Sequence, residues 1–528
     1  MERKLPNELE ELWNRLPERY QSIYGFEDSY EGKRPSHDRL EIIRRVVKEL
    51  SDLKGRRLKI LDIGASQGFF SVGLALDGNC VTAIDHNLDN VLFVQGLADY
   101  YSIQDKLDCQ NLDINDFIKS NSQEYDLVLC FSVLHHEYWK NGAESTRQVI
   151  DYLRRTCAVG IYELALKDEP LYWSASLPTS PLDDFMNYVF IDEIASVNNH
   201  LSDSQRPIFL VSDKFMLIEE SLTPIHDGFI PPHPFVDEMH RRRRAFLIDG
   251  NLLKFEYSFP SINHYRELEN EYEFLSRATD EIRQDLDLPT VACFSKGSFV
   301  SRLTRTFIPG KRIDQVLNAT NSKEIESAVL IHLRKWAKHG LYPNDLRPWN
   351  VIVQDDARVS YIDYGRSSDS CNDANGLNCI YALLTLLLYI RRSNPKSFTL
   401  APEEILSNLW DLEVVDLNLE WTEGFFEELT SSDFKLLQLI SHEDILKFNT
   451  QVKRLFTLTQ ERDELTQERD ELTQERDELT QQRDELTQQR DELTQQRDEL
   501  TQQRDEIVHS TIWKWTNPLR KVIDLFKK

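Results

Sequence analysis

The strongest constraint on the fold of this chain is a seven-residue repeat near its C-terminal end. Residues 458–506 contain LTQERDE three times and then LTQQRDE four times without interruption. Such a period predicts a parallel coiled coil over residues 451–507, with leucine at heptad position d and arginine at position a. Arginine is a poor core residue, but its stem can pack while the guanidinium reaches the glutamate or glutamine at position g. The repeats would form a rod of roughly 70–75 Å at 1.5 Å per residue.

The segment after the rod reverses the charge of the chain. The 528 residues carry a net charge of −27, but residues 508–528 hold five basic groups and one acid. Asn517 and Pro518 suit a helix start, and apolar residues then recur at helical spacing, at Leu519, Val522, Ile523 and Phe526. This pattern predicts an amphipathic tail that lies in a membrane surface with tryptophan anchors, or alternatively docks on a partner protein. The rod is then a spacer, unless it only oligomerises.

Length and composition limit the remaining possibilities. A chain of 528 residues can form two or three domains with full cores. Its net charge of −27 argues against a general nucleic-acid binder. The charged N-terminus predicts no secretory signal, and the longest apolar run, residues 379–390, is too short to span a bilayer. The seven cysteines form no CxxC pair, which fits a reducing cytoplasm without a zinc site or a disulfide framework.

A glycine-containing segment indicates the first domain. Residues 58–68, LKILDIGASQG, predict a buried strand, a glycine turn and a helix that starts near Phe69. This segment resembles motif I of class I S-adenosylmethionine-dependent methyltransferases, and residues 124–132 resemble the fourth strand of that family. We therefore expect residues 1–210 to form an α/β, Rossmann-like methyltransferase domain. The alternative is a doubly wound domain that binds another nucleotide.

The resemblance implies a cofactor crevice at the carboxyl edge of the sheet. Asp85, at the end of the strand over residues 80–85, would take both ribose hydroxyls. Asp113 would contact the adenine amino group. Arg19, Tyr20, Tyr24 and Arg39 are expected in opening helices that lid the cofactor, unless that segment is plain packing. The set implied for S-adenosylmethionine is Tyr20, Arg39, Gly64, Ala65, Gln67, Asp85, His86, Asp113, Ile114 and Phe131.

The methyl acceptor needs residues beyond the cofactor motifs. His135 and His136 follow the predicted fourth strand, at the edge where substrate would lie. Either imidazole could bind an anion or take a proton, although a histidine near a strand end is often structural. Glu163, Tyr172 and Trp173 follow the next predicted strand and could line the acceptor pocket.

A second motif indicates a kinase. Residues 345–350 have the spacing D-x-x-x-x-N, and Asp363 follows 13 residues after Asn350 in Tyr-Ile-Asp-Tyr-Gly. This arrangement resembles the catalytic loop and DFG element of the protein-kinase-like fold. We therefore expect residues 211–450 to form an α+β, bilobal domain that binds ATP and magnesium. The resemblance implies that Asp345 is the base, while Asn350 and Asp363 hold the metal.

Upstream residues complete this resemblance. Lys254, on a strand after an Asp249–Gly250 turn, is the candidate for contact with the ATP phosphates. Glu271, 17 residues later, would pair with it from a helix, and Arg347 would support the phosphates. Residues 306–311 resemble the segment after the hinge.

Several departures from the kinase pattern bear on its substrate. Four consecutive arginines, residues 241–244, precede the strand expected over residues 245–248, where kinases carry a glycine-rich loop. They are a solvated face or help to hold phosphates. The sequence Pro-Asn-Asp replaces His-Arg-Asp at Asp345, and no Ala-Pro-Glu segment follows Asp363. These departures favour a small-molecule or glycan kinase, with a pseudokinase as the alternative.

The order of methyltransferase, kinase, heptads and basic tail resembles the bifunctional kinase–methyltransferases that terminate polymannose O-antigen chains in Gram-negative bacteria. The resemblance rests on LPERYQ at residues 16–21, QGFFS at 67–71, SVLHH at 132–136, EPLYW at 169–173 and RPWNV at 347–351. It implies that the terminal sugar of a lipid-linked polysaccharide is phosphorylated and that this phosphate is then methylated. It also implies a trimer, peripheral on the cytoplasmic side of the inner membrane. The rod would set the distance from a membrane-bound polymerase.

Two other classes of function remain open from the residues alone. One is a scaffold for a polysaccharide polymerase, in which both heads are degenerate. The other is a kinase–methyltransferase that acts on protein or on a small metabolite.

Overall fold

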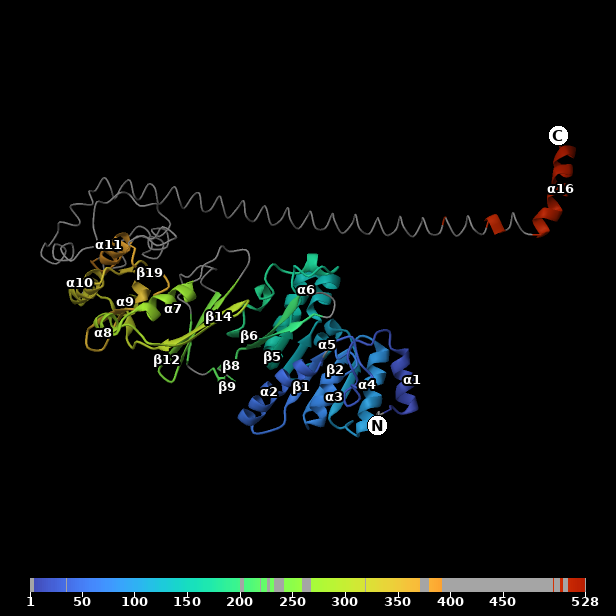
Figure 1. The fold of residues 1–528 in the computed structure, drawn as a ribbon, viewed down its shortest axis with the longest axis horizontal. Coiled ribbons are helices and arrows are strands. Elements are labelled where there is room, and N and C mark those ends of the chain that lie inside the picture. The colour runs from blue at the N-terminus through green and yellow to red at the C-terminus, as the bar shows by residue number, and fades with distance from the viewer. Residues whose placement is uncertain are drawn as a thin grey trace. The chain divides into compact units, whose positions relative to one another are not determined.

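The computed structural model divides the chain into two units, Met1–Asp433 and Phe434–Lys528 (Figure 1). It describes residues 4–34, 36–199, 204–218, 220–225, 228–231, 242–258, 267–318, 320–370, 379–391, 497, 504–506 and 511–527. The predicted coiled coil lies outside the described residues, except for Arg497 and residues 504–506, which are helical. The predicted kinase segment over residues 392–450 and Arg241 also lie outside them.

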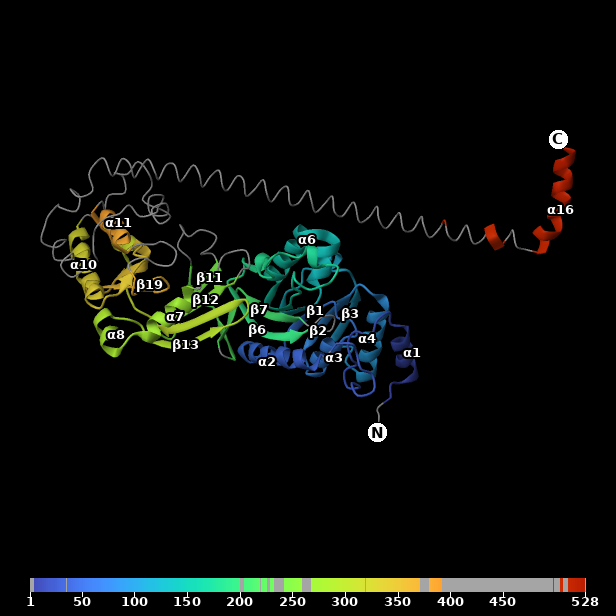
Figure 2. The ribbon, with the colours of Figure 1, turned by 45° about the horizontal axis from the view of Figure 1, so that its top comes forward.

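The first unit begins with a seven-stranded sheet in the order β3-β2-β1-β4-β5-β7-β6. Strands β1 to β5 run parallel, β7 runs antiparallel to β5, and β6 runs antiparallel to β7. Helices α2, α3 and α4 pack on one face and α6 on the other (Figure 2), with α5 against α6. The chain reverses its direction of sheet building between β1 and β4, which creates a crevice at their carboxyl ends. The bounds are α1 (Asn7–Arg15), α2 (His37–Lys54), β1 (Lys59–Ile63), α3 (Phe69–Leu76), β2 (Cys80–Asp85), α4 (Leu88–Tyr101), β3 (Leu107–Asn111), α5 (Ile114–Ser120), β4 (Tyr125–Phe131), α6 (Leu134–Thr156), β5 (Cys157–Glu163), β6 (Phe190–Asn198) and β7 (Gln205–Ser212).

The strands and the helix start predicted around the glycine segment are confirmed. Strand β2 has the predicted bounds, α3 begins at Phe69, and β4 lies within the predicted fourth strand. Glu163 differs slightly from its prediction, because it is the last residue of β5 and does not follow the strand. Two short helices, η1 (Ser174–Ser176) and η2 (Asp183–Phe185), lie between β5 and β6, and a short hairpin of β8 (Phe215–Ile218) and β9 (Ser221–Pro224) leads to the next sheet.

A five-stranded antiparallel sheet follows in the order β10-β11-β12-β14-β13. Its hairpin turn at Asp249 and Gly250 has positive φ at both residues, 48° and 77°, as a tight hairpin needs, and the predicted turn is confirmed. Strand β11 begins two residues before the predicted start, at Arg243. The elements are β10 (Phe229–Ile230), β11 (Arg243–Ile248), β12 (Asn251–Tyr257), α7 (Glu267–Arg277), α8 (Asp280–Leu286), β13 (Val291–Lys296) and β14 (Val300–Thr306).

The rest of the described first unit is helical, with short strand pairs. Strand β16 pairs with β19, and β17 pairs with both β15 and β18. These pairs place residues 344–350 and 362–366 between short strands. The elements are β15 (Lys311–Arg312), α9 (Ile313–Val316), α10 (Ser322–Lys338), β16 (Tyr342–Pro343), η4 (Pro348–Asn350), β17 (Val351–Val353), β18 (Val359–Tyr361), β19 (Ser367–Ser368) and α11 (Cys379–Arg391).

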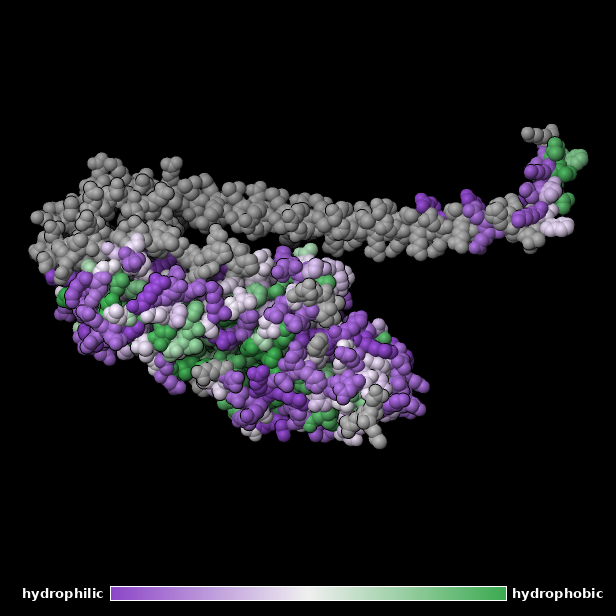
Figure 3. Space-filling model, viewed as in Figure 1, coloured by the Kyte–Doolittle hydropathy of each residue, from purple (hydrophilic) through white to green (hydrophobic). Residues whose placement is uncertain are grey.

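The C-terminal helix, α16 (Thr511–Phe526), begins earlier than the sequence predicted. Pro518 lies inside it, so the prediction that Asn517 caps the helix start is wrong. Proline has a helical φ but cannot donate the backbone hydrogen bond to the carbonyl of Lys514. On an exposed helix, water can bind that carbonyl instead. Apolar and polar side chains gather on different sides of this helix (Figure 3), and Leu519 and Phe526 are 64% and 87% exposed. No helix in the described part of the chain is long and apolar enough to cross a membrane.

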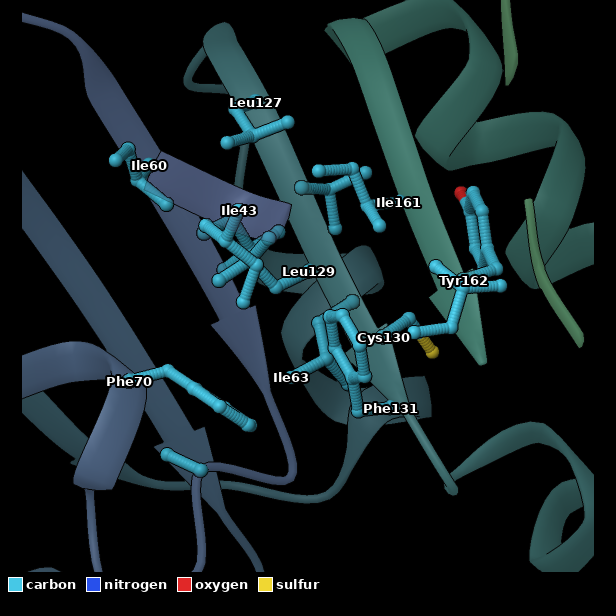
Figure 4. Packing of buried hydrophobic residues seen from close by; sticks show 14 of the residues in the cluster. Ile43, Ile60, Ile63, Phe70, Leu127, Leu129, Cys130, Phe131, Ile161 and Tyr162 are labelled. Atoms are coloured by element: carbon cyan, nitrogen blue, oxygen red, sulfur yellow. The ribbon is translucent and has the colours of Figure 1, made fainter. Parts of the chain in front are cut away.

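The core of the first unit runs through both sheets. Ile60 of β1, Leu127 and Leu129 of β4, and Ile161 of β5 pack together with Ile43 of α2 (Figure 4). Every residue of β4 and β5 is buried, as expected for central parallel strands covered on both faces.

The same buried cluster continues from β6 into the second sheet. Phe190 of β6 contacts Phe255 of β12 with ring centroids 5.4 Å apart. The Tyr257 hydroxyl donates to the Ile191 carbonyl at 3.0 Å, and Arg302 Nε donates to Asp192 Oδ1 at 2.8 Å. The two sheets therefore share one core and are not separate bodies joined by a linker.

Candidate functional site

The turn after β1 is shaped for close approach of the backbone. Gly64 and Gly68 have φ angles of 69° and 74°, a conformation that favours glycine. A Cβ on Gly64 would lie 2.5 Å from Cγ2 of Val133. Ala65, between them, is buried. The turn thus packs directly on the segment that follows β4, and a side chain at residue 64 would separate the two.

Asp85 lies beside this turn, at the tip of β2. Its carboxylate accepts the backbone N–H groups of Ser66 and Asn87, each at 2.8 Å. A carboxylate has about four acceptor positions, so it can still accept further hydrogen bonds where ribose recognition is predicted. His86, next in the chain, has a side chain that is 70% exposed.

The remaining residues predicted for the cofactor lie along the same edge. Asp113 caps α5 by accepting the Asn115 N–H at 2.9 Å. Ile114 is buried, and Phe131 at the end of β4 packs on Phe70 with centroids 5.3 Å apart. The structure therefore brings the predicted cofactor residues of β1, β2, β4 and α5 to one edge of the sheet. Their contact with S-adenosylmethionine stays a prediction.

Gln67 ties the N-terminal segment over this edge. Its Oε1 accepts the N–H groups of Tyr20 and Gln21 at 3.0 and 2.7 Å. Its Nε2 donates to the Glu18 carbonyl at 3.0 Å and to Asn90 Oδ1 at 2.9 Å. Both ends of this buried amide are used internally, so its visible role is to position residues 18–21.

The prediction that Arg19, Tyr20 and Tyr24 lie in helices is wrong. Helix α1 ends at Arg15 and α2 begins at His37, and these residues occupy the irregular segment between them. Pro17 explains the early end of α1, because proline cannot continue a helix interior without losing a hydrogen bond. Arg39 does lie in α2 as predicted, but its side chain is only 1% exposed.

Arg39 belongs to a buried charge network behind the crevice. Its Nε donates to Glu163 Oε2 at 2.7 Å, and Arg34 donates to the same oxygen. Burial opposes ionisation of Glu163, but these two guanidinium groups outweigh it, and the pKa of Glu163 lies below its usual value. Ser132 Oγ donates to Glu163 Oε1 at 2.7 Å. The network fixes the segment that leads to the two histidines.

Arg206 of β7 extends the network. Its Nε donates to Glu169 Oε1 at 2.7 Å, and its Nη1 donates to Ser132 Oγ at 3.1 Å. Its guanidinium also lies 5.9 Å from the ring centroid of Trp173. Arg206 therefore brings buried positive charge beside the predicted acceptor residues.

His135 and His136 start α6 in contact with each other and with Trp173. The centroid of the His135 ring lies 4.2 Å from that of His136 and 4.4 Å from that of Trp173. Burial, assisted by Arg206, lowers the pKa of His135 well below its ordinary value and that of His136 to about 4. Both imidazoles are therefore neutral near pH 7 and are weak bases. They suit the orientation of an acceptor better than proton abstraction.

The second sheet contains the predicted lysine–glutamate pair. Lys254 Nζ of β12 lies 2.6 Å from Glu271 Oε2 of α7, which confirms that pairing. The other oxygen of Glu271 accepts from Arg305 Nε of β14 at 2.8 Å. Arg305 Nη2 donates to the carbonyl of Ile362, the residue before Asp363, at 2.8 Å. The lysine, α7 and the predicted metal segment are thus linked by a single buried glutamate and a single buried arginine.

The predicted catalytic loop lies at the other side of this segment. Arg347 Nε is 3.0 Å from Asp345 Oδ1. Asn350 Nδ2 donates to the Asp345 carbonyl at 3.1 Å, and the Ile362 N–H donates to the Asn350 carbonyl at 2.9 Å. Burial raises the pKa of Asp345, while Arg347 opposes the shift and Asp363 adds to it. The structure therefore brings Asp345, Arg347, Asn350 and Asp363 together as the spacing predicted.

Asn344, which stands where protein kinases have arginine, has a structural role. Its Nδ2 lies within 3.0–3.1 Å of the Arg366 and Ser370 carbonyls and of Ser368 Oγ. The loop before Asp345 is thereby tied to the chain that follows Gly365. The longer side chain of an arginine at this position could not place a donor at the same point.

Four charged residues that organise these sites were missed by sequence reasoning: Arg34, Arg206, Arg305 and Glu267. Each lies outside the motifs, in a segment whose local pattern indicates only an exposed or strand position. Glu267 starts α7, and it pairs with Arg243 of β11 and with Arg366 Nε at 3.0 Å. Glu169, by contrast, lies in the segment EPLYW, which is one of the motifs quoted in the sequence analysis.

The described residues contain no group of three or more His, Cys, Asp or Glu side chains that could hold a metal. The predicted pair, Asn350 and Asp363, supplies one amide and one carboxylate. Magnesium usually takes one or two protein carboxylates and completes its shell with water and substrate phosphates. The pair fits magnesium only in that nucleotide-dependent form.

Comparison with known proteins covers most of the described chain. Over 385 residues, the sequence is 29% identical to the O-antigen chain terminator bifunctional methyltransferase/kinase WbdD of Escherichia coli. A solved structure of WbdD superposes with a TM-score of 0.61 at 25% identity, and covers 83% of this chain and 100% of that chain. The chain resembles WbdD. The resemblance predicted from the sequence motifs is confirmed by both comparisons.

The match to WbdD has a limited extent. It includes 68% of this chain and 52% of the E. coli protein, so the chain spans about half the length of the curated relatives it matches. The α/β sheet and the second, sheet-rich domain both have counterparts in the solved WbdD structures.

Two further matches are to methyltransferase-type proteins over shorter lengths. Residues 35–169 match the family of tellurite resistance protein TehB. A ubiquinone biosynthesis O-methyltransferase from Rickettsia prowazekii is 34% identical over 104 residues, which is 20% of this chain and 39% of that protein. Together with WbdD, these relatives support a methyltransferase fold for the first domain.

Proposed function

We propose that the chain is a bifunctional kinase and methyltransferase that ends the growth of a lipid-linked, O-antigen-type polysaccharide. The kinase head phosphorylates one hydroxyl of the non-reducing terminal sugar, and the methyltransferase head then methylates that phosphate, which blocks extension. The similarity to WbdD over both heads carries this proposal. The paired Lys254 and Glu271, linked through Arg305 to the segment of Asp363, support an active kinase over a degenerate one.

In the kinase head, Asp345 accepts the proton of the attacking sugar hydroxyl. Burial raises the pKa of its carboxyl, which strengthens it as a base. Lys254, held by Glu271, contacts the nucleotide phosphates. Asn350 uses Nδ2 on the Asp345 carbonyl, so its Oδ1 is the atom available to magnesium, together with Asp363. When bound, ATP supplies the phosphoryl group and magnesium offsets its charge.

In the methyltransferase head, the protein mainly has to orient the acceptor. A phosphate monoester is already a nucleophile, so its methylation depends on positioning more than on a strong base. When bound, S-adenosylmethionine supplies an electrophilic methyl group. Asp85 and the Gly64 turn would form the place for its nucleoside part, while His136 would orient the phosphate. The neutral state of both histidines agrees with this division of roles.

The C-terminal part extends the proposal to the whole chain. The heptads form a trimeric coiled coil that separates the heads from the cytoplasmic surface of the inner membrane. The basic tail binds that surface or a membrane-associated glycosyltransferase. A solved WbdD structure with an ordered C-terminal bundle supports a helical assembly in this region. The exposed apolar side of α16 supports an interfacial helix.

Replacing Asp345 with alanine tests the order of the two reactions. Because Asp345 is the base only for the sugar hydroxyl, the variant should lose phosphorylation of a short mannose oligosaccharide by about 10²–10⁴-fold. It should still methylate the same oligosaccharide after chemical phosphorylation. Transfer of labelled phosphoryl and methyl groups measures both steps.

Asp356→Ala is the matched control, because this aspartate lies in an exposed turn and pairs locally with Arg358. Loss of both transfers in Asp345→Ala, with a normal Asp356→Ala, would contradict the sequential scheme. If the wild type transfers neither group to any glycan, a scaffold is favoured. If it transfers them only to protein or to small metabolites, the acceptor is not a glycan.

A further inference from the structure

Two aromatic side chains stand exposed at the edge of the methyltransferase site. Trp139 of α6 is 50% exposed and Tyr172, which follows β5, is 61% exposed. Their rings meet edge to face with centroids 4.9 Å apart. An exposed tryptophan–tyrosine pair built from two separate elements leaves a large apolar surface in water, which commonly marks a binding site.

The pair is continuous with the buried acceptor residues. Tyr172 contacts Trp173 at 4.6 Å between centroids, and Trp173 contacts His135 at 4.4 Å and His136 at 5.4 Å. Trp139 lies on α6, one turn after His135 and His136. A ligand lying on the exposed pair would therefore extend directly toward the two histidines.

Two buried polar atoms next to the pair have no hydrogen-bond partner within the described part of the chain. These are His135 Nδ1 and Trp173 Nε1, in side chains that are each only 4% exposed. Buried polar atoms are nearly always hydrogen-bonded, and exceptions concentrate at functional sites. Lys140 lies one turn after His136 on α6. The guanidinium of Arg206, itself paired with Glu169, lies 5.9 Å from the ring centroid of Trp173. The position thus favours an anionic ligand with hydrogen-bonding groups.

These observations define the chemistry of the ligand. A pyranose ring has a C–H face that stacks on an aromatic ring, and hydroxyls around its rim that hydrogen-bond. Tyrosine and tryptophan suit such a ligand, since each combines an apolar face with a polar tip. Resting on the function proposed above, we propose that Trp139 and Tyr172 form a saccharide platform. It holds the sugar that carries the phosphate, or its neighbour, while His136 and Lys140 receive the phosphate.

The platform makes the methyltransferase select for the glycan and not for phosphate alone. Methylation of a phosphorylated oligosaccharide should then depend on Trp139 and Tyr172, whereas methylation of a phosphomonoester without a sugar should not. For Trp139→Ala and Tyr172→Ala, we expect KM for a phosphorylated mannose oligosaccharide to rise at least tenfold with kcat within about twofold. Trp139→Phe should retain most of the affinity. The KM for ethyl phosphate should not change.

Tyr100→Ala is the matched control, because Tyr100 of α4 is 44% exposed and contacts only Phe26 and Tyr101 among aromatic residues of the described chain. S-adenosylmethionine affinity, measured by calorimetry on each variant, reports whether the fold is intact. An unchanged KM for the phosphorylated oligosaccharide in both alanine variants overturns the platform. An equal rise in KM for ethyl phosphate also overturns it.

Direct binding separates this inference from the function it rests on. Calorimetric binding of the phosphorylated oligosaccharide should be lost in Trp139→Ala and retained in Tyr100→Ala, whether or not methyl transfer occurs. Binding without transfer by the wild type would support the platform and contradict the proposed methylation. Transfer by the wild type with binding that does not depend on Trp139 would leave the proposed function intact and overturn the platform.

Discussion

Single buried histidines show how far the interior departs from ordinary solution chemistry. His332 of α10 is buried, and its Nε2 accepts from Trp336 Nε1 at 3.1 Å, which requires a neutral imidazole. Burial and Lys335 lower its pKa to about 4, although Asp285 and Asp287 oppose the shift. An unfolded histidine has a pKa near 6.5. Between these values the unfolded chain binds the additional proton.

His332→Gln tests whether proton uptake by the unfolded chain at His332 lowers stability in acid. Because the unfolded state gains the proton, stability due to His332 is present above about pH 6.5 and is lost as the pH falls toward 4. Glutamine keeps an acceptor for Trp336 but does not titrate. We expect the free energy of unfolding of the wild type to fall more steeply than that of the variant, by up to about 1.4 kcal/mol per pH unit. Urea unfolding at pH 7 and pH 5 measures the difference, and parallel slopes would refute it.

At the scale of elements, α7 connects three parts of the second domain. Glu267 and Glu271 lie one turn apart, so both face the same side of the helix. Glu271 binds Lys254 and Arg305, while Glu267 pairs with Arg366. A Cβ on Gly365 would lie 2.9 Å from the Glu267 carbonyl oxygen. The helix is therefore held against the chain around Asp363 at two levels by ion pairs and close packing.

Arg305→Met tests the contact between Arg305 and Glu271. The variant keeps the volume of the side chain but leaves Glu271 with Lys254 alone and the Ile362 carbonyl without its donor. We expect a loss of about 2–3 kcal/mol in stability and at least a tenfold lower kcat for phosphorylation, because Asp363 is no longer held in register. Methylation of a pre-phosphorylated acceptor should stay within twofold. Arg358→Met, on an exposed turn, is the control, and equal kcat values in the two variants would argue against the link.

At the scale of the whole molecule, the shared core fixes how the heads work together. Asp192 of β6, which is buried and whose pKa burial raises to about 7, meets Arg302 of β14 across the junction. With such pairs and the Phe190 contacts, the two heads do not move as independent domains. Under the function proposed above, the acceptor would have to leave one head and enter the other, which is the step that the proposed saccharide platform on the methyltransferase head would serve.

Deleting two LTQQRDE repeats tests the role of the rod. The deletion would shorten a helical rod by roughly 21 Å at 1.5 Å per residue and keep the heptad phase. If the rod is a spacer, the modal length of the polysaccharide should change, as seen on silver-stained gels of the glycolipid. Exchanging two LTQQRDE repeats for LTQERDE keeps the length and should leave the distribution unaltered. An unaltered distribution after the deletion would eliminate the spacer.

The sequence alone predicted those features that are written within one segment. The strand over residues 80–85, the start of α3 at Phe69 and the Asp249–Gly250 turn follow from local periodicity and glycine chemistry. The spacing of Asp345 and Asn350 likewise needs only one loop. The irregular path of residues 16–34 was not predicted although Pro17 marks its start, and the Asn517–Pro518 capping signal was overridden by a helix that begins at Thr511.

Tertiary structure alone decided which distant charges meet and where the heads join. Arg34, Glu163 and Arg206 come from three segments, and Arg305 reaches Glu271 and Ile362 only after β14 has paired with β12. No local pattern encodes such contacts, because the energy of a buried charge depends on partners supplied by the rest of the fold. Periodicity and motif spacing thus determined the types of domain, whereas long-range burial determined the networks that hold their sites.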